Sequence, residues 1–157
     1  MIAVEVDASL AATLRDRWAN VEVVERDARA FPLPREPFVV VANLPFRGTT
    51  DLLHVLLDDP RVPLRRADLI VEWAVAVKLA VPWPTSVKGI LWSAWYEAGI
   101  TRRLPRTMFA PVPSVDAGVL VLRRRPVPLV PLERAEAYHR FVAAGFRRGL
   151  RAVISSR

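Results

Sequence analysis

Short apolar runs alternate with segments of helical periodicity along the first 60 residues. Residues 1–6, 21–24 and 39–42 are runs of strand length, and the last of them is rich in β-branched side chains, which is typical of a buried strand. The segment after the first run spaces its apolar residues at i, i+4 and i+8, and a leucine stripe follows the third run. This alternation predicts a parallel α/β sheet with right-handed helical crossovers.

The starts of these two helices can be predicted from residues with N-cap side chains. Ser9 is expected to cap the first helix, which presents Leu10, Leu14 and Trp18 on one face. Thr49 or Thr50 is expected to cap the second helix. The stripe of that second helix consists of Leu52, Leu53, Leu56 and Leu57.

The second half of the chain predicts further strands and a terminal helix. Residues 67–71 and 117–122 are apolar runs of strand length, and residues 72–80 continue the first of them as a helix. The tryptophan-rich segment 91–99 is expected to pack in the core or against the sheet. Three prolines then form a stiff linker, and residues 132–146 have the apolar spacing of an amphipathic helix.

Composition indicates a globular protein with a single main domain. The chain has 157 residues, of which 52% are hydrophobic, so it can bury a core. We interpret residues 1–125 as that domain, and residues 126–157 as a linker and the start of a C-terminal helical segment. No apolar run has transmembrane length, and acids stand at the start where a signal peptide would carry bases, so we expect a cytoplasmic protein that does not enter a membrane.

The side chains that commonly bind metals or form disulfides are scarce. The chain has no cysteine, which excludes a disulfide framework, a thiolate nucleophile and a cysteine-based zinc site. The two histidines, His54 and His139, stand far apart in sequence and indicate no metal site.

The charge of the chain favours a polyanionic partner. The formal net charge is +7, from 23 basic and 16 acidic residues, and most basic residues are arginines in the second half. Arginine clusters release counterions when they contact phosphates, so nucleic acid is the expected partner. The predicted RNA-binding residues are Arg102, Arg103, Arg106, Arg123, Arg124, Arg125, Arg147 and Arg148.

Acidic residues at the ends of the first two strands indicate a nucleoside site. Glu5 ends the first strand, where a carboxylate can accept hydrogen bonds from both ribose hydroxyls. Asp27 follows the second strand and is placed to accept from an adenine amino group, while the backbone of Ala28 contacts the edge of the ring. Open α/β sheets bind ligands at this carboxyl edge.

A rigid loop follows the third strand. Asn43 ends the strand, and Pro45 holds Leu44 in extended geometry, so the loop displays Asn43 and Phe46 at the same edge of the sheet.

Four motifs now give a resemblance to a known family. Ala-Val-Glu-Val-Asp (3–7), Arg-Asp-Ala (26–28), Asn-Leu-Pro-Phe (43–46) and Phe-Ala-Pro-Val-Pro-Ser-Val-Asp-Ala (109–117) occur in this order. The order resembles that of the rRNA adenine-N6 dimethyltransferases, over roughly residues 1–125. The aromatic segment 91–99 is more similar to the erythromycin-resistance (Erm) branch than to the housekeeping small-subunit branch. Glu-Trp-Ala-Val-Ala (72–76) stands where the family usually has Gln-x-Glu-Val-Ala, which also disfavours the housekeeping branch.

The resemblance implies an enzyme that transfers a methyl group from S-adenosylmethionine to the N6 of a specific adenine in 23S rRNA, and therefore macrolide-type antibiotic resistance. It implies that Asn43 and the Leu44 carbonyl accept from the target amine, that Phe46 stacks on the target adenine, and that Asn43 also lies beside the cofactor. The resemblance also implies that Glu5, Asp27 and Ala28 bind the adenosine end of the cofactor. The expected partner is rRNA, no metal is needed, and the family implies a monomer.

The same resemblance predicts a particular fold. It implies a Rossmann-like methyltransferase sheet in residues 1–125 that lacks the family's first strand and its Gly-x-Gly loop. That strand would lie between the strands of residues 1–6 and 38–42, and no two of the six glycines have Gly-x-Gly spacing. Residues 126–157 would then hold the linker and the start, as a remnant, of a small C-terminal helical RNA-binding domain. Two alternatives to a resistance enzyme remain open, a relative of the small-subunit rRNA dimethyladenosine transferases and a non-catalytic RNA-binding remnant.

Overall fold

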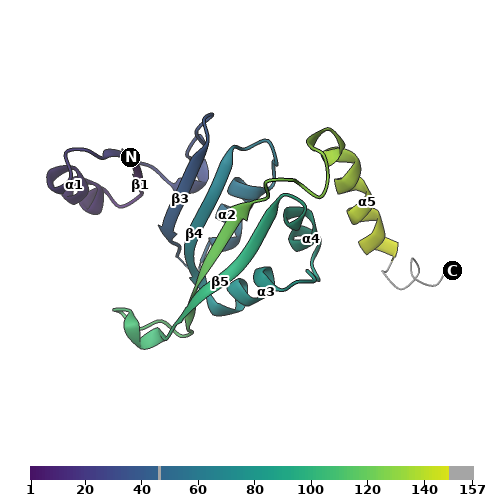
Figure 1. The fold of residues 1–157 in the computed structure, drawn as a ribbon. Helices are drawn as coiled ribbons and strands as arrows, with labels where there is room; N and C mark the ends of the chain where they lie inside the picture. The colour runs from purple at the N-terminus through teal and green to yellow at the C-terminus, as the bar shows by residue number, and fades with distance from the viewer. Residues whose placement is uncertain (46, 149–157) are drawn as a thin grey trace.

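The computed structural model describes residues 1–45 and 47–148. Arg148 is described by its backbone only. The strands are β1 (Ile2–Glu5), β2 (Glu22–Glu25), β3 (Phe38–Asn43), β4 (Leu64–Glu72), β5 (Tyr96–Leu104) and β6 (Ala117–Arg124). The α-helices are α1 (Ala8–Arg17), α2 (Thr49–Leu57), α3 (Trp73–Ala80), α4 (Val87–Ser93) and α5 (Ala135–Arg148) (Figure 1). Three short 3-10 turns complete the set, η1 (Ala28–Ala30), η2 (Arg106–Met108) and η3 (Leu132–Arg134). The predicted mixture of strands and helices is confirmed.

The described strands form two separate sheets. A two-stranded parallel sheet joins β1 to β2, and a four-stranded sheet has the order β3-β4-β6-β5. β3 pairs with β4 in parallel, as predicted, but β6 runs antiparallel to both β4 and β5. The parallel pairing predicted for the first part of the chain is therefore confirmed, and the sheet as a whole is mixed. β6 is antiparallel because the connection between β5 and β6 leaves and re-enters the sheet at one end, so that β6 runs back along β5.

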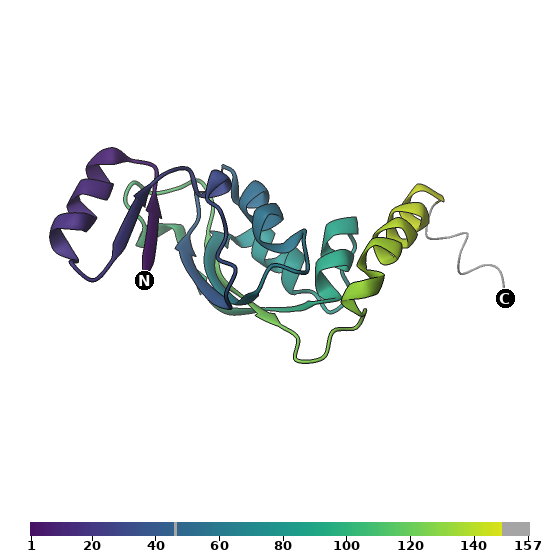
Figure 2. The same ribbon diagram turned by 90° about the horizontal axis from the view of Figure 1, so that it is seen from above.

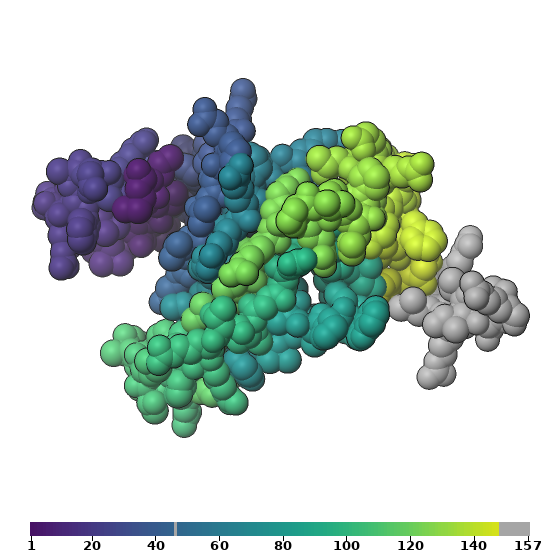
Figure 3. All heavy atoms as spheres, viewed as in Figure 1, coloured from purple at the N-terminus to yellow at the C-terminus, as the bar shows by residue number. Residues whose placement is uncertain are grey.

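The sheet is discontinuous at the place where the resemblance predicts a further strand. Within the described residues no hydrogen-bonded ladder joins β1 to β3. Figure 2 shows β1, rather than β2, on the side that faces β3. In Figure 3 the segment from β1 to β2 forms a lobe at one side of the molecule.

This N-terminal lobe, residues 1–26, buries little apolar surface. α1 begins after Asp7, whose carboxylate accepts from the backbone N–H groups of Ser9 at 2.8 Å and Leu10 at 3.1 Å. Asp7 is thus the N-cap, and the prediction of Ser9 is wrong by two positions. Leu10 and Trp18 are exposed, and Ala11 is the buried residue of the helix, because α1 packs against a sheet of only two strands.

β3 is buried on one face only. Its residues alternate in exposure along the strand, and Val39 and Val41 are 56% and 80% exposed. The prediction of a buried strand therefore holds for one face only, because the described helices α2, α3 and α4 lie together on one side of the sheet and leave the other side open (Figure 2).

The core lies between this sheet and its helices. The leucine stripe of α2 is confirmed, since Leu53, Leu56 and Leu57 are buried against the sheet. The prediction that the tryptophan-rich segment packs in the core is also confirmed, because Trp92, Trp95 and Tyr96 are all buried.

The last helix packs on the main domain. The Tyr138 hydroxyl donates to the carbonyl of Ile90 on α4 at 3.2 Å, and the rings of Trp95 and Tyr138 meet edge to face at 5.9 Å. Ala135 and Val142 are buried, as the amphipathic pattern predicts. The boundary between residues 125 and 126 stays a prediction, and residues 149–157 lie outside the described part of the chain. Among the described residues no helix is long and apolar enough to cross a membrane.

A polar cluster fastens α2 to α4. The Asp58 carboxylate, at the C-terminal end of α2, accepts from Lys88 Nζ at 2.6 Å and from Trp92 Nε1 at 2.9 Å, and lies 2.9 Å from His54 Nδ1. Partial burial acts to raise the pKa of Asp58, but the hydrogen bonds from Lys88, His54 and Trp92 outweigh it and hold the pKa below its ordinary value.

We expect the free energy of unfolding to depend on pH through Asp58. A carboxylate with a lowered pKa in the folded state stabilises the fold above its unfolded pKa and loses that contribution as pH falls through the folded value. Asp58→Asn should therefore destabilise the protein at pH 6, and the difference from the wild type should shrink towards pH 3. Urea unfolding at both pH values measures this, with Asp16→Asn on exposed α1 as the control. A deficit of Asp58→Asn that stays constant between the two pH values would contradict the assignment.

Candidate functional site

A cavity of about 790 Å³ lies at the carboxyl ends of β1, β2 and β3. The N-terminal lobe and η1 form one wall, and the loop after β3 with the start of α2 forms the other. Its lining residues are Val4, Glu5, Val6, Arg26, Asp27, Ala28, Arg29, Ala42, Asn43, Leu44, Pro45, Arg47, Gly48, Asp51 and Leu52. All the described residues that the sequence predicts for the nucleoside and for the target amine line this one cavity.

Glu5 is fixed at the end of β1 by the chain that follows it. Its Oε1 accepts from the backbone N–H groups of Val6 at 2.8 Å and Asp7 at 2.9 Å. These bonds hold the carboxylate in one orientation at the cavity wall. Within the described part of the chain, Oε2 has no hydrogen-bond partner, so it can accept from a ligand hydroxyl.

Asp27 caps η1 and forms an ion pair with Arg29. The carboxylate accepts from the backbone N–H of Arg29 at 2.8 Å, and Arg29 Nη2 lies 2.6 Å from Oδ2. The side-chain hydrogen bond from Arg29, followed by that from its backbone N–H, lowers the pKa of Asp27 below its ordinary value. Ala28, the first residue of η1, lies in the cavity wall beside this pair.

The loop after β3 displays Asn43 and buries Leu44. Asn43 is the last residue of β3 and is exposed, whereas Leu44 is 4% exposed and its N–H donates to the Ile70 carbonyl at 3.0 Å. The Thr49 hydroxyl donates to the Pro45 carbonyl at 2.8 Å and closes the loop. Phe46 lies outside the described residues, so its predicted role stays a prediction.

α2 begins differently from the prediction. Its N-cap is Gly48, with a left-handed φ of 96°, and Thr49 is the first helical residue. The prediction of a Thr49 or Thr50 cap is wrong because the Thr49 side chain is bonded to Pro45, and the sharp turn requires a glycine.

Four charged residues that the sequence reasoning missed also line the cavity. Arg26, Arg29 and Arg47 come from both walls, and Asp51 lies on the first turn of α2, 3.6 Å from Arg29 Nη1. Their nearness in sequence to the Arg-Asp-Ala and Asn-Leu-Pro-Phe motifs was the available signal.

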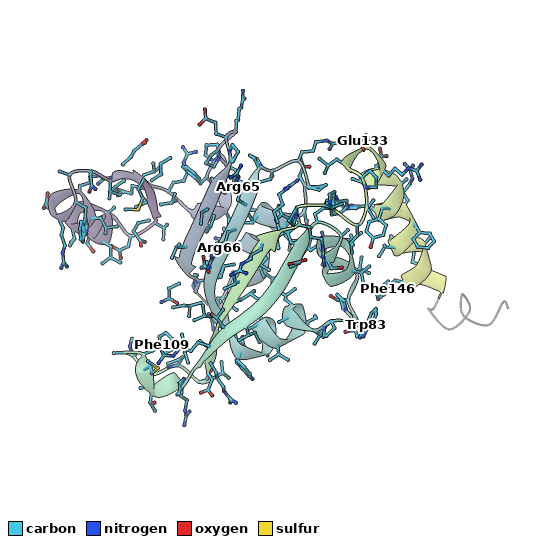
Figure 4. All side chains as sticks on the ribbon, in the orientation of Figure 1. Arg65, Arg66, Trp83, Phe109, Glu133 and Phe146 are labelled. Carbon is cyan, nitrogen blue, oxygen red and sulfur yellow. The ribbon has the colours of Figure 1, made fainter. Side chains whose placement is uncertain are left out.

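The loop between β5 and β6, residues 105–116, lies at the end of the sheet to which β3 and β4 point, and Figure 4 shows Phe109 on it. Asp116 accepts from the backbone N–H of Arg106 at 2.9 Å and from Arg103 Nε at 3.0 Å. These two bonds, the first more than the second, hold the pKa of Asp116 below its ordinary value. Arg103 also lies over the Trp73 ring at 4.8 Å, so its charge is used within the fold.

The predicted RNA-binding arginines differ in their surroundings. Arg124 donates to the carbonyls of Pro60 and Val62, and Arg125 donates to the Ser93 carbonyl and to Glu97. These two side chains therefore fasten parts of the fold together. The exposed members of the set are Arg102, Arg103, Arg106, Arg123 and Arg147, and the side chain of Arg148 lies outside the described residues.

A second cavity, of about 340 Å³, lies among α3, α4 and β5. It is lined largely by apolar side chains such as Leu79, Trp92 and Leu122, and contains no residue predicted for the nucleoside or the target amine. In the described part of the chain, no group of three or more histidine, aspartate or glutamate residues is placed to hold a metal ion.

Comparisons with known proteins agree on one family. The family model described as ribosomal RNA adenine dimethylase matches residues 1–156. An rRNA adenine N-6-methyltransferase of Corynebacterium diphtheriae is 39% identical and covers 92% of this chain and 57% of its own length. The mycinamicin-resistance protein MyrB of Micromonospora griseorubida is 37% identical and covers 99% of this chain and 50% of its own length.

A solved structure supports the same grouping. The crystal structure of the 23S rRNA methyltransferase ErmE matches with a TM-score of 0.82 and 28% identity, over 93% of this chain and 61% of that chain. The chain thus spans about half the length of the curated relatives it matches.

We expect Gly48→Ala to destabilise the protein, because a left-handed backbone costs an L-residue about 1–2 kcal/mol. Gly99→Ala on β5 is the matched control, since Gly99 has no positive φ, and a Cβ at either position meets nothing within 4 Å. Urea unfolding of both variants measures the difference. Equal stability of the two would show that the turn at Gly48 can relax.

Proposed function

The chain belongs to the ribosomal RNA adenine dimethylase family, and from this we propose that it binds S-adenosylmethionine and transfers its methyl group to the N6 of an adenine in 23S rRNA. The observation that carries the proposal is the meeting of Glu5, Asp27, Ala28 and Asn43 around one cavity. Similarity to MyrB and ErmE favours the large-subunit substrate and, with it, macrolide-type resistance.

The residues of the cavity fit the adenosine part of that cofactor. Glu5 is held by two backbone N–H groups with one oxygen available, which suits a ribose hydroxyl. Asp27 stays ionised beside Arg29 and is the proposed acceptor for the amino group, in competition with that arginine. Ala28 lines the cavity beside Asp27, where its backbone would contact the edge of the base. The cofactor supplies an electrophilic methyl group on a sulfonium, and the side chains of this chain bind and orient it.

Asn43 and Leu44 are proposed to prepare the methyl acceptor. The lone pair of an adenine N6 is delocalised into the ring, which makes the amine a poor nucleophile. Acceptors at its two hydrogens, the Asn43 side-chain oxygen and the Leu44 carbonyl, draw the lone pair out of conjugation and direct it at the methyl group. The β3–β4 ladder fixes both residues, so they need little reorganisation during the reaction.

Phe46 is proposed to stack on the target adenine once that base has left its RNA helix or loop. Stacking of a base on an aromatic ring contributes about 1–3 kcal/mol and offsets part of the unstacking cost.

The proposed RNA contacts come from exposed arginines. Arg123 lies on β6 between the core-facing positions of the strand, so it points to the sheet face opposite the helices. On β5 a register shift after Ile100 pairs Arg102 with Val119, which puts Arg102 on the same face as Arg123. Arg106 lies in the loop at the carboxyl edge of the sheet. A duplex or loop that crosses this face would bring a target base towards Asn43.

We expect Asn43→Ala to abolish methyl transfer while changing cofactor affinity less, since the proposed role of Asn43 is at the acceptor amine. The measurement is transfer of labelled methyl from S-adenosylmethionine to a 23S rRNA fragment, with cofactor binding followed by calorimetry. Asn20→Ala, at an exposed position outside the cavity, is the matched control. Transfer by Asn43→Ala at the wild-type rate would refute the role of Asn43. If the wild-type protein binds the RNA but transfers no methyl group, the alternative of a non-catalytic RNA-binding remnant is favoured.

Binding of the rRNA fragment should weaken steeply with salt. Arg102→Gln with Arg123→Gln should reduce the slope of log K against log salt by about one for each arginine that contacts a phosphate. The control is Arg17→Gln with Arg35→Gln, which removes equal charge from other exposed positions. If the two double variants have the same slope, the sheet face is not the RNA surface.

A further inference from the structure

Arg29 is hydrogen-bonded to the Asp27 carboxylate, the group that the proposed function assigns as acceptor for the adenine amino group. Oδ1 of Asp27 accepts from the Arg29 backbone N–H at 2.8 Å and from Nε at 3.1 Å. Oδ2 accepts from Nε at 3.0 Å and from Nη2 at 2.6 Å. Arg29 thus supplies three N–H groups, with the Nε–H shared between the two oxygens, to a carboxylate that offers about four lone pairs in all. An amino group that approaches Asp27 must therefore compete with the guanidinium.

A second carboxylate, that of Asp51, is near enough to pair with the Arg29 guanidinium when it leaves Asp27. Asp51 lies on the first turn of α2, across the cavity from η1, and its Oδ2 is 3.6 Å from Arg29 Nη1. The side chains of Arg29, Asp27 and Asp51 are 54%, 39% and 63% exposed, so the exchange of one partner for the other carries little desolvation cost.

The two positions of Arg29 would have opposite effects on the cavity. On Asp27, the guanidinium competes with an incoming amino group. On Asp51, it frees Asp27 and links η1, the turn that follows the N-terminal lobe, to α2.

We propose that Arg29 is a positioning residue that exchanges between Asp27 and Asp51, and that this exchange sets the preference of the cavity for nucleosides with a 6-amino group. The inference rests on the proposed function, since it takes Asp27 as the acceptor of that group. The ligand class is an adenosine-bearing molecule. A purine nucleoside without the amino group makes no demand on Asp27 and leaves Arg29 in place.

The test is calorimetric titration of two probes, adenosine and purine riboside, which lacks the 6-amino group. Arg29→Gln removes the internal competitor and should bind adenosine severalfold more tightly than the wild type. Asp51→Asn removes the second partner and should bind adenosine severalfold more weakly. Purine riboside should bind all variants alike, which a general effect on folding would not produce. Arg35→Gln, an exposed arginine outside the cavity, should match the wild type for both probes.

The possible results separate this inference from the proposed function. The ratio of adenosine affinity to purine riboside affinity can be compared between each variant and the wild type. If Arg29→Gln and Asp51→Asn both keep the wild-type ratio, the exchange is overturned, but the cavity remains a nucleoside site. Weaker adenosine binding by Arg29→Gln would also overturn it, because Arg29 would then support the ligand. No adenosine binding by any variant would overturn the inference together with the assignment of the cavity to a nucleoside. Binding by Arg29→Gln alone would support the exchange.

Discussion

The parallel ladder between β3 and β4 is the contact on which the site depends. It runs from Phe38 to Asn43 and is extended by the bond from Leu44 N–H to the Ile70 carbonyl. Because Leu44 is also buried in the core, the backbone at the carboxyl end of β3 is held from two sides. The backbone that carries Asn43 is thereby held in place at the wall of the cavity. Gly48 then allows the chain to turn sharply into α2.

The opposite wall of the cavity is held less firmly. The N-terminal lobe shares no strand ladder with the rest of the described chain, and its helix buries only Ala11. What joins the lobe to the main domain near the cavity is η1, together with the approach of Arg29 to Asp51. Asp27 and Glu5 are therefore oriented mainly by bonds to their own neighbouring residues.

Arginine serves two purposes in this fold. Arg124 reaches the carbonyls of the segment before β4, and Arg125 reaches the end of α4, so both hold the last strand to its surroundings. Arg102 and Arg123 instead project from the strands into solvent. Within the part of the chain that the structure describes, the run of three consecutive arginines thus contains one exposed member without a partner, Arg123, and two whose charge the fold already uses.

The sequence by itself determined most of the elements, the core of α2 and the tryptophan-rich segment, and the family, because apolar periodicity and short motifs are local properties. It also placed Glu5, Asp27 and Asn43 at strand ends, and parallel strands bring such ends together. Tertiary structure alone decided the rest. The antiparallel course of β6, the exposure of Val39 and Val41, and the engagement of Arg124 depend on which segments lie side by side, which no local pattern records. The nearness of Arg29 to Asp51 belongs to the same class, because Asp51 on α2 is 22 residues away in sequence and meets Arg29 only across the folded cavity.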